Sequence, residues 1–149
     1  MRSHGWSLVG AALAALALAP AASAAGFVVD DLSDADRPYP AGTCASPCTL
    51  RDAIQAVNSG PGTGDTIAFS VTGRISVTSG LPPLTASVAI DGGSLGAVQL
   101  DSVPSRNFGL QFSAGASTVQ RLVLTRFDMA ILASGTAEAC SRSAPRRST

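Results

Sequence analysis

The sequence predicts an all-β fold, a parallel β-helix of about three rungs with an N-terminal amphipathic capping helix. Two observations lead to this class. From residue 66 onward the chain consists of short alternating apolar and polar runs, which Gly, Ser, Pro and Asn separate as turns separate strands. Apolar positions recur in these runs at intervals of about 20 to 24 residues without an intervening helical pattern, which is typical of stacked rungs.

The first 24 residues have the organisation of a secretory signal peptide. A basic start at Arg2 is followed by an apolar run at residues 8–19, and Ala22-Ser23-Ala24 supplies the small-x-small pattern that a signal peptidase recognises. The apolar run is shorter than the roughly 20 residues that span a bilayer, so an uncleaved anchor is the weaker alternative. We expect cleavage after Ala24 and a secreted or cell-surface protein, with no membrane span in the mature chain.

The composition of the exported part excludes several kinds of catalytic and metal-binding site. His4 is the only histidine and lies in the segment to be removed, and all ten Lys/Arg positions are arginines. A histidine base, a histidine metal ligand and a lysine Schiff base are therefore excluded. Residues 25–137 contain nine acidic residues and six arginines. A mildly acidic chain with few aromatic residues argues against nucleic-acid binding.

Residues 25–65 are expected to form an N-terminal cap. They contain a short strand at 27–29, an Asp-rich loop at 30–47 and one helix at 49–58, which the Gly-rich residues 59–65 end. A stack of rungs exposes apolar core and unpaired backbone groups at its ends. An amphipathic helix directly before the first rung is suited to cover one of them.

The residues of this helix have structural roles in our interpretation. Thr49 suits the N-cap, with Asp52 completing a weak capping box. We expect Arg51 and Asp52 to pair with loop and backbone groups at the helix start, and Asn58 to end the helix in a left-handed conformation. An apolar face at i, i+4 and i+7 predicts burial. The helix-cap residues are Thr49, Leu50, Arg51, Asp52, Ile54, Val57 and Asn58.

Residues 66–136 are expected to form the rungs, which lie about 4.8 Å apart in such a stack. The candidate strands are 66–71, 74–79, 87–91, 97–101, 108–113, 120–125 and 129–134. One recurring apolar series is Ile67, Ile90, Leu110 or Phe112, and Ile131; a second is Val77, Leu100 and Leu124. A β-sandwich is the alternative, but it needs hairpin turns, and Asp91-Gly92 is the only two-residue hairpin signal of its type.

Residues 27–58, FVVDDLSDADRPYPAGTCASPCTLRDAIQAVN, resemble the start of exported bacterial proteins with the CSLREA domain. That family has a strand, an Asp-rich loop, two cysteines and Ser/Thr-Leu-Arg-Glu-Ala-Ile, and Thr49 and Asp52 replace its usual Ser and Glu. The matching residues are Cys44, Cys48, Thr49, Leu50, Arg51, Asp52, Ala53, Ile54 and Asn58. The resemblance extends to residue 135, with Arg121 where Gly is common. It implies a right-handed parallel β-helix of the pectate-lyase-like kind, with no activity assigned for most members.

Cys44 and Cys48 are expected to form a structural disulfide that ties the Asp-rich loop to the helix start, because a disulfide is the default for an exported chain. A redox pair typically has two intervening residues and a neighbouring βαβ pattern, which are lacking here. A zinc site would need four ligands, for which only Cys140 and carboxylates remain.

Three other patterns have structural explanations that we prefer to functional ones. GGSLG at residues 92–96 matches a nucleophile elbow but lacks the histidine and the following helix, so it predicts a turn. The acids of the Asp-rich loop could collect calcium, but their spacing departs from the EF-hand and favours Asx-turns; they are Asp31, Asp34 and Asp36. A polysaccharide lyase would use outward acids and a basic residue, here scattered singly: Asp91, Asp101 and Asp128 with Arg106, Arg121 or Arg126.

The sequence therefore predicts an exported non-catalytic β-helix module without cofactor or metal, a surface scaffold or an adhesin-like carbohydrate-binding region. The alternative is a truncated polysaccharide lyase or glycoside hydrolase of the pectate-lyase-like fold. After residue 136 the strand pattern gives way to a basic tail, 137–149, that we expect to be disordered and that contains an unpaired Cys140. Three explanations are compatible with this ending: a tail on a tiny coil, self-association through the open last rung, and a fragment shortened by a frameshift. The Ser/Arg/Pro/Ala-rich composition of the tail favours the fragment.

Overall fold

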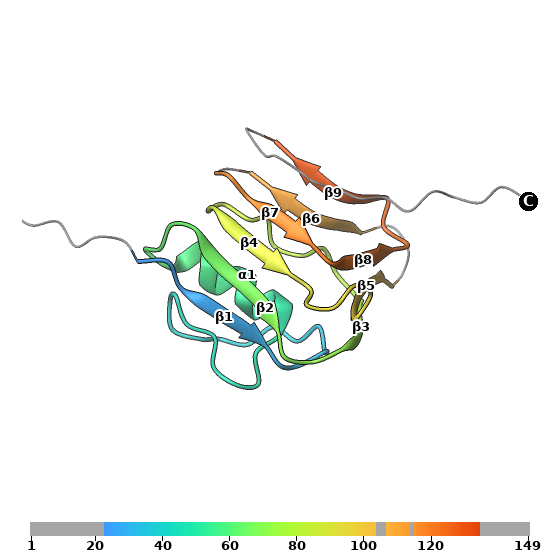
Figure 1. Ribbon diagram of the computed structural model, residues 1–149, viewed down its shortest axis with the longest axis horizontal. Coiled ribbons are helices and arrows are strands. Elements are labelled where there is room, and N and C mark those ends of the chain that lie inside the picture. Colours follow the sequence, from blue (N-terminus) through green and yellow to red (C-terminus); the bar gives the residue numbers. More distant parts are fainter. Residues whose placement is uncertain (1–22, 104–106, 114, 135–149) are drawn as a thin grey trace, which may run out of the picture.

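The computed structural model describes residues 23–103, 107–113 and 115–134 (Figure 1). The predictions for residues 1–22, for the tail 137–149 with Cys140 and for Arg106 lie outside these ranges. The described part is rich in strands and contains one helix. The elements are β1 (Gly26–Val29), α1 (Leu50–Ser59), β2 (Asp65–Phe69), β3 (Gly73–Val77), β4 (Val88–Asp91), β5 (Val98–Ser102), β6 (Phe108–Phe112), β7 (Thr118–Gln120), β8 (Leu122–Thr125) and β9 (Met129–Ala133).

The strands form three parallel sheets. The first has the order β1-β2-β4-β7, the second β3-β5-β8, and the third β6-β9. Successive segments of the chain add one strand at a time to each sheet, so β2, β4 and β7 lie side by side although long connections separate them (Figure 1). An isolated parallel bridge pairs Leu84, in the connection between β3 and β4, with Phe112 of β6. Parallel pairing of this kind excludes the β-sandwich built from hairpins.

Apolar side chains stack in register inside the sheets, but not entirely in the two predicted series. Ile67 lies beside Ile90 as predicted, and the next residue in that row is Val119, 29 positions later. Leu110 lies instead in the third sheet, beside Ile131. The predicted series therefore combines residues of two sheets, because a repeat in the sequence does not tell which sheet a strand joins.

The second predicted series is also wrong, because its first residue is displaced by two positions along β3. Ile75, rather than Val77, lies beside Leu100, which in turn lies beside Leu124, and Val77 lies beside Ser102. Side chains alternate between the two faces of a strand, so a slip of two residues keeps the same face buried. The burial pattern therefore fitted the sequence equally well in either register.

The run 120–125, predicted as one strand, is two strands that meet at a corner. Gln120 ends β7 in the first sheet, and Leu122 begins β8 in the second. Arg121 between them has φ 59°, in the left-handed region. That conformation is rare for a residue with a side chain and common for glycine. The other predicted strands agree with the structure to within about two residues.

The helix and the sheets share one apolar core. Leu50, Ile54 and Val57 are buried as predicted and belong to the same cluster as Ile67, Ile90 and the other inward strand residues. α1 packs against β1, at the end of the molecule opposite β9 (Figure 1). No helix in the described ranges has the length and apolar character needed to cross a membrane.

Candidate functional site

The N-terminus of α1 has the predicted capping box. The backbone amide of Asp52 donates to Thr49 Oγ1 at 3.1 Å, and the backbone amide of Thr49 donates to Asp52 Oδ2 at 3.1 Å. The Thr49 hydroxyl also donates to the carbonyl of Ala35 at 2.8 Å. Thr49 and Asp52 are both buried, so these bonds satisfy polar groups that water does not reach.

Arg51 connects the helix to two other segments. Its Nε and Nη2 atoms donate to Asp34 Oδ1 at 3.1 and 2.8 Å, and Nη1 and Nη2 donate to the carbonyls of Gly80 and Ser79 at 2.9 and 3.0 Å. Asp34 Oδ2 in turn accepts hydrogen bonds from the amide and hydroxyl of Thr78, both at 2.8 Å. Arg51 is 7% exposed, so this ion pair holds the Asp-rich loop, α1 and the chain after β3 together away from solvent.

Asn58 acts differently from the prediction. It lies within α1, which continues to Ser59, and the C-cap residue is Gly60 in an extended conformation. Because the helix does not end in a left-handed residue, Asn58 has no capping role at its own position. Its side chain donates to the carbonyl of Pro83 at 2.7 Å and accepts from the amide of Thr85 at 2.9 Å, which attaches the helix to the connection before β4.

The two predicted cysteines pair. The sulfur atoms of Cys44 and Cys48 lie at disulfide distance, with their Cα atoms 5.5 Å apart. The amide of Cys48 donates to Asp30 Oδ1 at 2.7 Å, and the carbonyl of Cys48 accepts from the amides of Asp30 and Asp31. A hydrogen bond from the Ser46 hydroxyl and then the one from Cys48 lower the pKa of Asp30. The end of β1 is thereby fixed to the start of the helix.

The three acids considered for calcium have three different partners. Asp31 binds Arg37 at 2.7 Å and accepts from the amide of Ser33 in an Asx-turn, Asp34 binds Arg51, and Asp36 accepts from Gln55 at 2.9 Å. Hydrogen bonds from Ser33 and from Arg37 lower the pKa of Asp31. Asp34 and Asp36 therefore attach the loop to α1, whereas Asp31 pairs within the loop.

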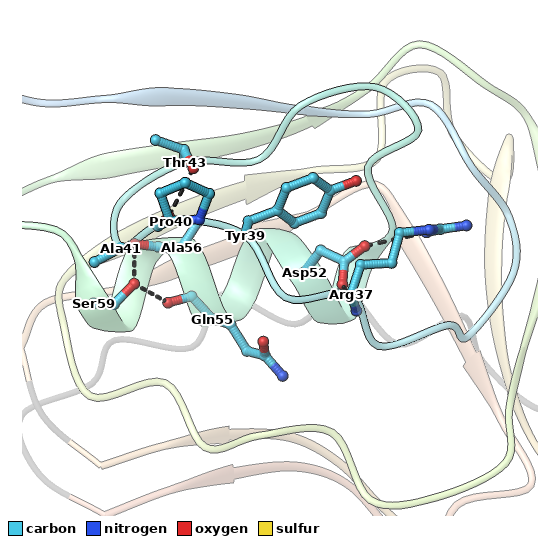
Figure 2. A pocket seen from close by; sticks show the side chains of 9 residues that line it. All are labelled: Arg37, Tyr39, Pro40, Ala41, Thr43, Asp52, Gln55, Ala56 and Ser59. Atoms are coloured by element: carbon cyan, nitrogen blue, oxygen red, sulfur yellow. Dashed lines mark hydrogen bonds and ion pairs between the residues drawn. The ribbon is translucent and has the colours of Figure 1, made fainter.

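A pocket of about 280 Å³ lies between α1 and the end of the Asp-rich loop (Figure 2). The hydroxyl of Tyr39 donates to the carbonyl of Pro47 at 2.5 Å, which fixes the ring at the wall of the pocket. The amide of Gly42 donates to Ser59 Oγ at 3.0 Å, so the far end of the loop is attached to the last turn of the helix. The lining residues are Arg37, Tyr39, Pro40, Ala41, Thr43, Asp52, Gln55, Ala56 and Ser59.

The carboxylate in this pocket is occupied by structural hydrogen bonds. Asp52 Oδ1 accepts from the backbone amide of Arg37 at 2.8 Å, and Oδ2 accepts from Arg37 Nη1 at 3.2 Å and from the amide of Thr49. Its side chain has no exposed surface. A general base must reach the proton that it takes, so Asp52 is poorly placed for this role. The pocket instead presents an aromatic ring and the Arg37 guanidinium beside neutral hydrogen-bonding groups, an arrangement that can bind a small polar ligand.

The acids considered for a lyase lie in different elements, and two of them pair with the arginines considered as bases. Asp91 at the end of β4 binds Arg121, and Asp101 in β5 binds Arg126 and, at 3.3 Å, Arg74. Hydrogen bonds from these arginines are the largest cause of the lowered pKa values of Asp91 and Asp101. The same contacts raise the pKa values of Arg121 and Arg126.

Asp128 lies just before β9, which belongs to the third sheet. GGSLG forms the predicted turn, between β4 and β5, with Gly93 and Gly96 at φ 76°. No cluster of three or more potential metal ligands is found in the ranges that the structure describes.

Sequence reasoning missed the pocket. It assigned residues 30–47 to a loop and weighed only the acids and Cys44 within it, while Tyr39 is the only tyrosine of the chain and lies between two prolines. An aromatic side chain in a Pro-rich loop directly ahead of the helix was the available signal. No model of a known protein family, no curated protein and no solved structure matches the chain.

Proposed function

We propose that the chain is a right-handed parallel β-helix with α1 as its N-terminal cap. The path of the chain supports this arrangement: β2 and β3 are followed by β4, β5 and β6, and then by β7, β8 and β9, each strand parallel to its counterpart. Right-handed crossovers are the rule for parallel strands. These three passes support the proposal of three rungs, and β1 adds a further strand beside the first.

The cap proposal is supported by the position of α1. The inward row of the first sheet starts at Phe27 in β1, and α1 packs against β1 with an apolar face that is buried from Leu50 to Val57. An end rung must cover its apolar core, and an amphipathic helix does so while Arg51, Asn58 and the disulfide attach it at three places.

We infer membership of the CSLREA-domain proteins from the sequence resemblance, and export from the signal-peptide organisation of residues 1–24. The Cys44–Cys48 pair supports export, since disulfides persist in oxidising compartments. The buried positions of Thr49, Leu50, Arg51 and Asp52 explain why the motif has these residue types: two complete the capping box, one fills the core and one binds the Asp-rich loop.

We further propose that this exported module is non-catalytic and serves as a surface scaffold with an adhesin-like, carbohydrate-binding pocket. The observation that carries the non-catalytic part is the pairing of Asp91 and Asp101 with arginines on separate sheets. Other outward positions hold neutral hydrogen-bonding residues, among them Thr66, Ser76, Gln99, Thr118, Gln120 and Thr125. Such a surface is that of a solvated scaffold.

The pocket beneath Tyr39 is the proposed ligand site. Aromatic rings bind the apolar faces of sugars while side-chain amides and hydroxyls bind their hydroxyl groups. At about 280 Å³ the pocket lies just under the range of drug-sized sites, and therefore suits a single sugar residue of a longer glycan.

The test is a glycan-array screen of the mature protein, followed by calorimetric titration of the best glycan. We expect Tyr39→Ala to abolish binding. Tyr39→Phe keeps the ring and loses only the hydrogen bond to Pro47, so it is the matched control and should retain most of the affinity. Unchanged binding by Tyr39→Ala would place the ligand elsewhere, and an array without any bound glycan would reject the binding role.

The alternative, a truncated polysaccharide lyase or hydrolase, is tested with the same protein. Ca²⁺-dependent release of unsaturated uronates from pectic substrates would overturn the non-catalytic proposal. If such activity were found, Asp101→Asn should remove it, since this variant breaks the Arg74–Asp101–Arg126 group at the centre of the second sheet.

A further inference from the structure

Asp65 is a buried carboxylate without a cationic partner in the described ranges. It begins β2, is 1% exposed, and lies beside the inward residue Val88 of β4. Its Oδ1 atom accepts a hydrogen bond from the backbone nitrogen of Ala25 at 2.8 Å. Its Oδ2 atom is buried and has no hydrogen-bond partner among the described residues.

The surroundings hold both groups firmly in place. The amide of Thr66 donates to the carbonyl of Ala25 at 2.8 Å, which continues the pairing of β1 with β2 by one residue and fixes Ala25 opposite Asp65. A Cβ atom at Gly62 would lie 2.3 Å from Asp65 Oδ1 and 3.0 Å from Oδ2. Glycine at position 62 is therefore what leaves space for the carboxylate.

One neutral amide is a poor match for a buried carboxylate. Removing an ionised carboxylate from water is unfavourable unless a cation and hydrogen bonds compensate it. An amide nitrogen has a single N–H, whereas an α-ammonium group has three N–H donors and a positive charge. If the same nitrogen were a chain terminus, it would supply the positive charge and the further N–H donors that Asp65 lacks.

We propose that Asp65 is the binding site for the α-ammonium group of Ala25, which removal of the signal peptide creates. This inference rests on the proposed export and adds a structural role for the new terminus. A signal peptidase hydrolyses the Ala24–Ala25 peptide bond: water supplies the hydroxyl for the Ala24 carbonyl, and the Ala25 nitrogen leaves as an amine that takes a proton. Ser23 and Ala24 are exposed, so the bond lies at the surface.

The consequence is that processing completes the fold. In the precursor, Asp65 has one amide donor; in the mature chain it has a buried ion pair that joins β1 to β2 beside the cap. The mature protein is therefore more stable than any form in which the Ala25 nitrogen is acylated.

The chain permits a clean test, because it contains no lysine. In a mature chain that begins at Ala25, the α-amine is the only primary amine, and acetic anhydride therefore acetylates it selectively among amines. The folding equilibrium constant of the free and acetylated proteins is measured by urea unfolding near pH 6, where an ordinary α-amine is protonated. We expect acetylation to lower this constant about tenfold or more. A chain that begins at Ser23 should behave like the acetylated protein.

The Asp65→Asn variant identifies the partner. In this variant acetylation should change the folding equilibrium constant less than about twofold, because the charge that the ammonium group binds is gone. An equal loss on acetylation in the wild type and in Asp65→Asn would overturn the proposal, as would no loss in the wild type.

A kinetic measurement covers the case in which Asp65→Asn does not fold. In the folded wild type, the α-amine should react with the anhydride at least about tenfold more slowly than in urea-unfolded protein, since Asp65 holds it protonated and covered. Equal rates would overturn the proposal. Intact-mass analysis of the exported protein tests export separately: cleavage at a site other than Ala24–Ala25 would leave export intact and remove this role of Asp65.

Discussion

At the scale of single residues, Gly92 and Arg121 show how closely successive connections pack. Gly92 follows β4 and Arg121 lies between β7 and β8, and the amide of Gly92 donates to the carbonyl of Gln120 at 3.0 Å. A Cβ atom at Gly92 would lie 2.2 Å from the carbonyl oxygen of Arg121, far inside van der Waals contact. The two corners are therefore in direct backbone contact.

We expect Gly92→Ala to lower the free energy of unfolding by about 2 kcal/mol, because the added methyl group forces the two corners apart. Gly80→Ala is the matched control. Position 80 has no atom within 4 Å of an added Cβ, so this change should stay within about 1 kcal/mol of the wild type. Urea unfolding followed by circular dichroism measures both. Equal effects of the two substitutions would show that the corners do not touch in solution.

Arg121 combines an unfavourable backbone with a favourable side chain. Its φ of 59° is unfavourable for a residue with a Cβ atom by about 1–2 kcal/mol. Its solvent-exposed ion pair with Asp91 contributes little in compensation. Arg121→Gly and Arg121→Ala both remove the ion pair, but only glycine relieves the backbone. We expect the glycine variant to be more stable than the alanine variant by about 1 kcal/mol in urea unfolding. The opposite order would contradict a left-handed residue at this corner.

At the scale of secondary-structure elements, Arg51 attaches α1 to the Asp-rich loop and to the chain that follows β3. Arg51→Met should lower the free energy of unfolding by about 3 kcal/mol, because the buried Asp34 loses its cation while the carbonyls of Ser79 and Gly80 lose their donors. Arg74→Met is the control: this side chain is 58% exposed beside Asp101, so its loss should be within about 1 kcal/mol. Similar losses for the two variants in chemical unfolding would argue against a buried attachment.

The second sheet has a pH-dependent connection between its strands. Asp101 in β5 binds Arg126 after β8 and Arg74 in β3, and the contact with Arg126 is the main cause that lowers the pKa of Asp101 below its ordinary value of 3.8. A carboxyl group with a lowered folded-state pKa stabilises the fold above its unfolded-state pKa. This stabilisation disappears as the pH falls through the folded-state pKa, when the carboxyl group is protonated in both states.

We therefore expect Asp101→Asn to be less stable than the wild type near pH 7, and the difference to shrink as the pH falls below about 3.8, as measured by urea unfolding from neutral to acid pH. Arg126→Gln should show the same convergence at low pH, since it removes the main partner of the same carboxylate. A difference that stays constant from neutral to acid pH would mean that the ion pair is not responsible for it.

At the scale of the whole molecule, features that depend on local patterns of burial can be predicted from the sequence, whereas features that depend on which segments become neighbours in the fold cannot. Strand positions, the helix face and the capping box follow from alternation and periodicity, which depend on neighbours in sequence. The row from Ile90 to Val119 was missed because an additional strand, β6, lengthens that pass of the chain. The bonds of Asn58 were missed for a similar reason, since Pro83 and Thr85 meet the helix only in the folded chain.

The candidate site shows the same limit. Acids and cysteines were found because their chemistry is visible residue by residue, and the structure then gave each acid of the loop its own partner. The pocket was not found, because Tyr39 and Gln55 come from different segments and form a wall only when the loop closes on α1.

The two ends of the stacked sheets differ, which leads to a prediction about assembly. α1 packs against the β1 end, whereas β7, β8 and β9 are the last strands of their sheets in the described part of the chain. Inward residues there are only partly buried, among them Leu124 and Ile131. Unpaired strand edges next to apolar side chains favour pairing with a second copy.

We therefore expect the mature protein to self-associate through β7, β8 and β9, with a sedimentation coefficient that rises with concentration. Leu124→Lys should abolish this association, because an inward-pointing charge at the last rung cannot be buried by a second copy. Val28→Lys is the control: Val28 is 52% exposed in β1, on the outer face at the other end, and its replacement should leave association unchanged. Sedimentation velocity at several concentrations measures all three proteins, after circular dichroism has verified that each is folded. A monomer at every concentration, or equal loss of association in both variants, would show that the β9 end is not the contact.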